Sequence, residues 1–235
     1  MKGAIKPYQS RAYLAENLKD IIRSGIMEIL NQIKEKIISA ILYYYIDFVY
    51  KTSKIERYGN LEYLESEYPD KFILFIWHGD SFCYYPFLKQ KKLNVVTTKN
   101  KRGGVITRIS HYFGYDVLRL PDLAADGNYI FQLKNKINKA NNANLVLSVD
   151  GPEGPEHEIK DFAMIMALFS KRKILPLTID VKNSVKLTSR WDNLKIPLPF
   201  NKIIINVNDY FIVEKQDRKE NFISLKKEIR KIMES

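Results

Sequence analysis

The sequence LVLSVDGPEGP, residues 145–155, joins a short apolar run directly to a stretch made of turn-forming residues. Residues 145–149 have the length and continuous hydrophobicity of a strand that is covered on both faces of a sheet. Residues 150–155 contain two glycines, two prolines and two carboxylates, a composition that builds rigid turns. The stretch therefore indicates a buried parallel strand whose carboxyl end carries polar groups on an ordered loop.

Comparable apolar runs recur along the chain, and helical patterns separate most of them. Strands are predicted at residues 71–77, 93–98, 116–120, 145–149 and 174–179, with shorter ones at 185–187, 203–207 and 211–213. Helices are predicted at residues 105–113, 128–140, 159–170 and 222–233. This alternation predicts an α/β fold with a mixed, mostly parallel sheet flanked by helices.

The N-terminal part of the chain, residues 11–50, has the longest helical pattern. Its most apolar part, residues 37–50, contains Asp47 and is shorter than the roughly 20 residues that a membrane span needs. We expect one or two amphipathic helices, packed on the core or lying on a membrane surface. Residues 1–54 are thus expected to be a helical, membrane-associated segment and residues 55–235 an α/β domain. The apolar positions are Leu14, Leu18, Ile21, Ile22, Ile26, Leu30, Ile33, Ile37 and Ile41.

The charge and the cysteine content limit the classes of partner. The chain has 38 Lys and Arg against 27 Asp and Glu, a net charge of +11, which suits an anionic membrane surface or an anionic substrate. Nucleic acid would also suit this charge, but no nucleic-acid-binding motif accompanies it, and we expect no such partner. The single cysteine, Cys83, excludes an intramolecular disulfide and a cysteine-based zinc site. The N-terminus lacks the apolar segment of a signal peptide, which favours peripheral binding at the cytoplasmic face of a membrane.

Polar residues lie where several predicted strands end. His78 follows the first strand, Arg119 lies near the end of the third, and Asp150 and Glu153 follow the fourth. Because ligands bind outside the carboxyl ends of strands in open α/β sheets, these side chains are expected to gather along one edge. An imidazole there could act as a general base, and an arginine could bind a phosphate through two hydrogen bonds.

The order of these motifs resembles the lysophospholipid and glycerol-phosphate acyltransferase superfamily. It is most similar to a bacterial branch described as an acyltransferase-like domain of unknown function. The resemblance covers roughly residues 55–213, and its motifs are Trp77-His78 and residues 113–119, 150–155, 174–177 and 189–200.

The resemblance implies a glycerol-phosphate acyltransferase-like fold and an O-acyl transfer. An acyl group carried by coenzyme A or acyl carrier protein would move to a hydroxyl of a lysophospholipid or a related lipid acceptor. His78 would be the general base. The process would need no metal and no bound cofactor. The residues that would bind the acceptor are Arg119, Asp150, Gly151, Pro152, Glu153 and Gly154.

One position departs from the superfamily pattern. An Asp usually stands five residues after the catalytic His and orients it, and here that position is Cys83. Asp80 is the expected substitute, with Asp150 and Glu153 as alternatives. Two other interpretations follow from the departure: a catalytically decayed lipid-binding protein of the same fold, or a Cys83 nucleophile that His78 activates.

Overall fold

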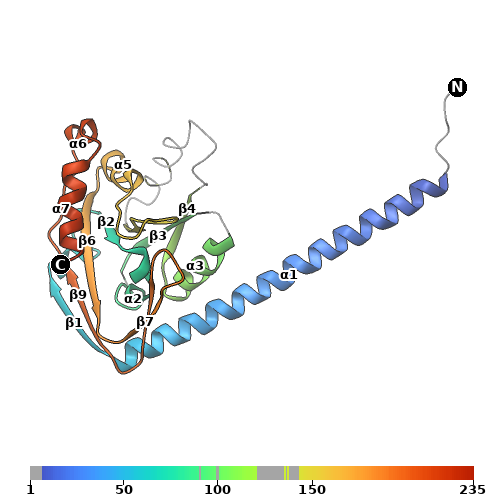
Figure 1. Cartoon of the computed structure of the whole chain (residues 1–235), viewed down its shortest axis with the longest axis horizontal. Helices are drawn as coiled ribbons and strands as arrows, with labels where there is room; N and C mark the ends of the chain where they lie inside the picture. The colour runs from blue at the N-terminus through green and yellow to red at the C-terminus, as the bar shows by residue number, and fades with distance from the viewer. Residues whose placement is uncertain (1–6, 90, 99–100, 121–134, 136, 138–142) are drawn as a thin grey trace.

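A computed structural model describes residues 7–89, 91–98, 101–120, 135, 137 and 143–235 (Figure 1). Within them a seven-stranded sheet has the order β1-β9-β6-β2-β5-β3-β4. Neighbouring strands run parallel except β6 and β9, so the predicted mixed, mostly parallel α/β sheet is confirmed. The strands are β1 (Lys54–Gly59), β2 (Phe72–Ile76), β3 (Leu93–Thr98), β4 (Asp116–Leu120), β5 (Asn144–Ser148), β6 (Lys173–Val181) and β9 (Lys202–Val207).

The central strand β2 is buried on both faces, which explains its uninterrupted apolar sequence. Alternate side chains point to opposite faces of a strand, and Leu74 and Phe75 accordingly belong to two different core clusters. One cluster joins β2 to α1, α2 (Ser81–Tyr84) and α3 (Lys101–Tyr112). The other joins it to α5 (Asp161–Ser170) and α7 (Ile223–Met233). The sheet therefore has helices on both faces.

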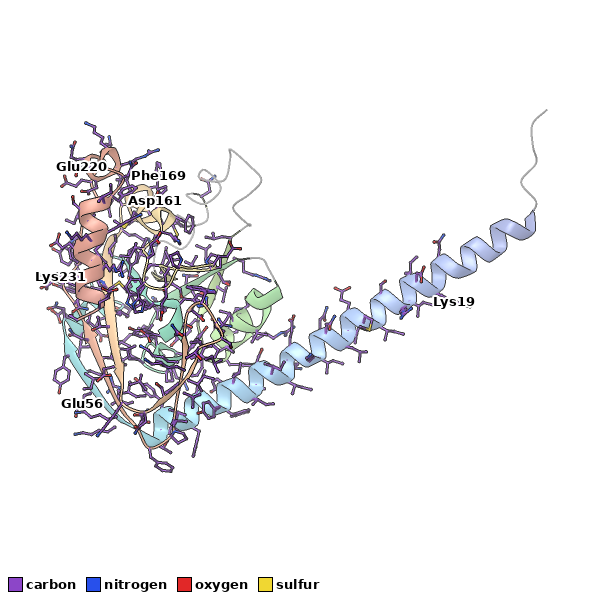
Figure 2. The ribbon with its side chains drawn as sticks, viewed as in Figure 1. Lys19, Glu56, Asp161, Phe169, Glu220 and Lys231 are labelled. Carbon is purple, nitrogen blue, oxygen red and sulfur yellow. The ribbon has the colours of Figure 1, made fainter. Side chains whose placement is uncertain are left out.

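The N-terminal segment is one long helix, α1 (Pro7–Thr52), of which only the C-terminal part packs on the body. Ser39, Ile46 and Val49 are buried, and this part of α1 lies against α3. Towards its N-terminus, α1 extends away from the body (Figure 1). Lys19 stands far from the sheet in Figure 2. None of the helices in the described part of the chain combines enough length with enough apolar character to span a bilayer.

A small hairpin outside the main sheet covers the turn that follows β2. It consists of β7 (Ser184–Leu187) and β8 (Leu194–Pro197), which pair antiparallel. The hairpin contacts α2 and the short 3-10 helix η2 (His78–Asp80). The Tyr45 hydroxyl of α1 donates a 2.9 Å hydrogen bond to the Pro197 carbonyl, which also ties the hairpin to the body.

The predicted elements and the observed ones differ in a few places. β1 and β8 were not predicted, because the first is a mostly exposed, polar edge strand and the second is very short. The predicted strand at residues 211–213 is only an isolated bridge between Phe211 and Ile174. The predicted helix at residues 128–140 lies almost entirely outside the described residues. The remaining short elements are η1 (Leu61–Leu64) and α6 (Lys215–Lys219).

Candidate functional site

The turn after β2 and the loop after β5 meet, because these two strands are parallel neighbours. Asp150 is fully buried, and its carboxylate accepts hydrogen bonds from two backbone N–H groups. His78 donates to Oδ1 at 2.8 Å, and His157 donates to Oδ2 at 3.1 Å. Burial raises the pKa of the Asp150 carboxyl, although these two N–H groups oppose the rise. Asp150 thus fixes the backbone of His78 instead of facing a ligand.

The His78 imidazole contacts a carboxylate from the hairpin. His78 Nδ1 lies 2.6 Å from Asp192 Oδ2, and the Asp192 side chain is fully buried. Arg190 donates to the same carboxylate from Nε at 2.8 Å and from Nη2 at 2.7 Å. Burial would raise the pKa of Asp192, but the hydrogen bonds from Arg190 and His78 outweigh burial and hold it below its ordinary value. An ionised Asp192 can only accept, so Nδ1 carries the proton and Nε2 is left free to act as a base.

Three glycines allow the backbone to approach this centre closely. A Cβ on Gly79 would lie 2.2 Å from the Asp192 carbonyl oxygen, and one on Gly151 would lie 2.8 Å from His78 Cδ2. A Cβ on Gly154 would lie 2.6 Å from the Trp191 ring, and Gly154 also has a positive φ of 71°. The glycines of the turn-rich loop are therefore explained by contact with the imidazole and with the hairpin.

A cavity of about 640 Å³ lies beside the imidazole, within the roughly 300–1,000 Å³ typical of ligand sites. Its polar lining includes His78, Glu153, Lys160 and Arg190, and Trp191 lies 5.1 Å from the His78 ring, measured between centroids. The rest of the lining is mostly apolar, and it comes from β2, β3, β4, β5 and β8, from α2, α3 and α5, and from the segments between them. Such a cavity can hold a hydrocarbon chain next to a base. Apolar and aromatic side chains that line it include Tyr84, Leu88, Leu93, Val95, Ile106 and Tyr115.

The two residues near His78 in sequence have other surroundings. The Asp80 carboxylate forms an ion pair with Lys195 of β8, with an N–O distance of 2.7 Å. Burial raises the pKa of Asp80, and Lys195 opposes the rise. Cys83 is buried, and burial raises the pKa of its thiol. A thiol held in its protonated form does not suit the role of nucleophile.

The other predicted site residues differ in whether they line the cavity. Gly151, Pro152, Glu153 and Gly154 line the cavity. Arg119 lies near the end of β4, which is separated from β2 by β5 and β3, and it is not among the described residues that line the cavity.

Asp192 and Arg190 were not among the predicted site residues. The expected carboxylates are close to His78 in sequence or follow the neighbouring strand, whereas Asp192 is 114 residues away. The available signal was the stretch at residues 189–200, which resembles the bacterial branch and contains both residues. Within the described residues, no group of three or more His, Cys, Asp or Glu side chains is arranged to hold a metal ion.

Comparisons with known proteins show that the chain has a known fold. No family model matches the sequence. The chain is 28% identical over 204 residues to an uncharacterised protein of Rickettsia prowazekii (strain Madrid E), a match that covers 85% of this chain and 91% of that protein. It is also similar to the crystal structure of the 1-acyl-sn-glycerophosphate (LPA) acyltransferase PlsC from Thermotoga maritima, with a TM-score of 0.50 and 10% identity over 94% of this chain and 90% of that one. The protein therefore shares the α/β fold of that acyltransferase.

Proposed function

We propose that the protein transfers a fatty acyl group from an acyl thioester to a hydroxyl of a lysophospholipid or a related lipid acceptor. The observation that carries this proposal is an imidazole whose Nδ1 is held by a buried carboxylate, next to a large, mostly apolar cavity. The shared fold with an acyltransferase supports it. The Asp192 contact also favours an active site over a decayed one, since the imidazole has a carboxylate partner despite Cys83.

The chemistry requires one proton transfer and one bond exchange. His78 Nε2 removes the proton from the acceptor hydroxyl while the oxygen attacks the thioester carbonyl carbon. The tetrahedral intermediate then collapses, the carbon–sulfur bond breaks, and the thiol of coenzyme A or acyl carrier protein leaves with a proton from the imidazolium. An ester is formed, and His78 returns to its initial state. The acyl chain would lie in the apolar cavity, and residues 151–154 would contact the acceptor.

We further propose that α1 binds an anionic membrane surface, where a lipid acceptor would be located. The part of α1 that extends from the body exposes large apolar side chains, with Ile22, Ile26 and Leu30 each more than half exposed. Lys19 and Arg23 are also exposed on this part. Apolar residues together with cations are typical of helices that lie in a membrane interface.

Acid side chains on the apolar face of α1 are expected to weaken its binding to vesicles. At helical periodicity, Ile26 and Ile33 share one face, while Asn17 and Asn31 lie on the opposite face. Ile26→Asp with Ile33→Asp should weaken flotation with phosphatidylglycerol-containing vesicles by about tenfold or more, because apolar contact area is lost from the interface. Asn17→Asp with Asn31→Asp makes the same change in charge and should retain most binding. Equal loss in both variants would contradict the assignment of the face, and a dimer that needs the two isoleucines would point to self-association.

The proposed reaction is tested with purified full-length protein and labelled acyl-coenzyme A and acyl carrier protein donors. The acceptors are a lysophospholipid panel and a total lipid extract, supplied in vesicles. A labelled lipid ester that appears with the protein and not with buffer is the expected result. Saturable lipid binding without turnover of any donor would overturn the proposal and favour a lipid-binding protein of the same fold.

A further inference from the structure

We infer that Asp192 is the positioning residue for His78 and takes the role that an acid five residues after the histidine would otherwise have. The inference rests on the proposed function. The residue comes from the β7–β8 hairpin, far from His78 in sequence, and it acts through the imidazole without contacting the substrate. The site would thus be completed only when the hairpin docks on the turn after β2.

The electrostatics of Asp192 suit this role. Its carboxylate is fully buried, yet two Arg190 donors and one imidazole nitrogen satisfy it, and its pKa lies below the ordinary value. A buried carboxylate remains charged only with such partners. The negative charge selects the tautomer with the proton on Nδ1 and stabilises the imidazolium that forms during proton transfer.

Of the three carboxylates expected as substitutes, Glu153 is exposed and the other two have different partners. Asp80 pairs with Lys195, and Asp150 accepts the backbone N–H groups of His78 and His157. Cys83, at the position where the acid would stand, is buried, with its Sγ 3.9 Å from the Lys195 carbonyl oxygen. The polypeptide that covers the turn here is thus the hairpin that carries Asp192.

The docking of the hairpin is fixed at several points. Gly79 and Gly154 allow contact with the Asp192 backbone and the Trp191 ring, where a Cβ would clash. The Asp80–Lys195 ion pair also joins β8 of the hairpin to the turn. A carboxylate held this firmly meets the geometric demand on a group that orients a catalytic base.

Asp192→Asn is the first test, because it removes the charge at nearly constant shape. We expect acyl transfer to fall by about 10²–10⁴-fold, mainly in kcat, since an amide can donate to Nδ1 and favour the wrong tautomer. The matched control is Asp180→Asn, the same change at an exposed position of β6, which should keep the wild-type rate.

Nitrogen NMR of histidine-labelled protein provides a readout that a merely structural role would not change. The chain has three histidines, so replacing His111 and His157 by Gln assigns the signals. At a pH where the imidazole is neutral, wild-type His78 should carry its proton on Nδ1, and Asp192→Asn should move the tautomer equilibrium towards Nε2–H.

The outcomes separate the inference from the proposed function. A wild-type His78 with its proton on Nε2 would overturn the inference without any substitution. An Asp192→Asn protein with reduced transfer and an unchanged His78 tautomer would also overturn it, since the aspartate would then be structural only. If wild-type protein transfers no acyl group from any donor, the proposed function fails, and a tautomer shift in Asp192→Asn still supports the positioning role.

Discussion

His78→Gln is expected to lower acyl transfer by about 10²–10⁴-fold, the usual contribution of a general base. Glutamine cannot take a proton from the acceptor hydroxyl at neutral pH. Its backbone N–H can still donate to Asp150, and Asp192 keeps both hydrogen bonds from Arg190. The fold should therefore survive, with the free energy of unfolding reduced by about 1 kcal/mol for the lost side-chain hydrogen bond.

The measurement is kcat/KM for the best donor and acceptor pair, with thermal unfolding recorded on the same samples. His111→Gln is the matched control, because His111 lies exposed near the end of α3 and should tolerate the change with an unaltered rate. A wild-type rate in His78→Gln would show that the imidazole is not the base. If His78→Gln lowered the thermal stability as much as a core substitution does, its loss of activity would be explained by unfolding and not by the missing base.

Much of the fold could be predicted because its strongest signals are local. β2 and β5 are continuous apolar runs since both faces of each strand are covered, and this pattern needs no knowledge of distant residues. The helix predicted to end at residue 113 corresponds to α3, which ends at Tyr112, and the following Gly114 has a positive φ of 85° and donates its N–H to the His111 carbonyl at 3.0 Å. The position of His78 after a buried strand was likewise evident from the sequence.

The part that could not be predicted depends on contacts between distant segments. Asp192 and His78 meet because a two-stranded hairpin folds back over the turn, and nothing in the periodicity of residues 184–197 encodes that docking. The constraint on Gly79 is also tertiary, because a Cβ at this position would lie 2.2 Å from the Asp192 carbonyl oxygen. The resemblance to the acyltransferase superfamily implies a carboxylate near His78, but only the tertiary structure shows which one is there.

Lys195→Met is expected to be strongly destabilising, because it leaves the buried Asp80 carboxylate without its cation. The Asp80 side chain is 6% exposed and that of Lys195 is 27% exposed. Breaking a fully buried pair costs about 3–5 kcal/mol, and the partial exposure of Lys195 reduces the expected loss to about 2–3 kcal/mol at neutral pH. The matched control is Lys186→Met, at the exposed residue that pairs with Lys195 across the hairpin, which should change stability by less than about 0.5 kcal/mol.

The pH dependence identifies the charge responsible. Burial raises the pKa of Asp80 in the folded protein above its ordinary value. The stability that the protonated carboxyl contributes is therefore fully present below the pKa that Asp80 has in the unfolded chain, and it is lost as pH rises through the pKa that Asp80 has in the folded protein. Removing Lys195 takes away the cation that opposes the rise in the Asp80 pKa, so the loss of stability continues to higher pH. The deficit of Lys195→Met should therefore be small in acid, where Asp80 is protonated in both proteins, and should grow towards neutral pH.

A second substitution separates the buried charge from the lost packing of the lysine. Adding Asp80→Asn to Lys195→Met should recover most of the stability at neutral pH, because the amide can be buried without ionising. Urea unfolding of the four proteins in this cycle, repeated in acid and at neutral pH, measures the coupling. A deficit that is independent of pH, or that Asp80→Asn does not relieve, would show that Asp80 is not the uncompensated charge. Because the same ion pair ties the hairpin to the turn after β2, the doubly substituted protein should remain folded yet transfer acyl groups more slowly than wild type, as the carboxylate of Asp192 is then less firmly held against His78.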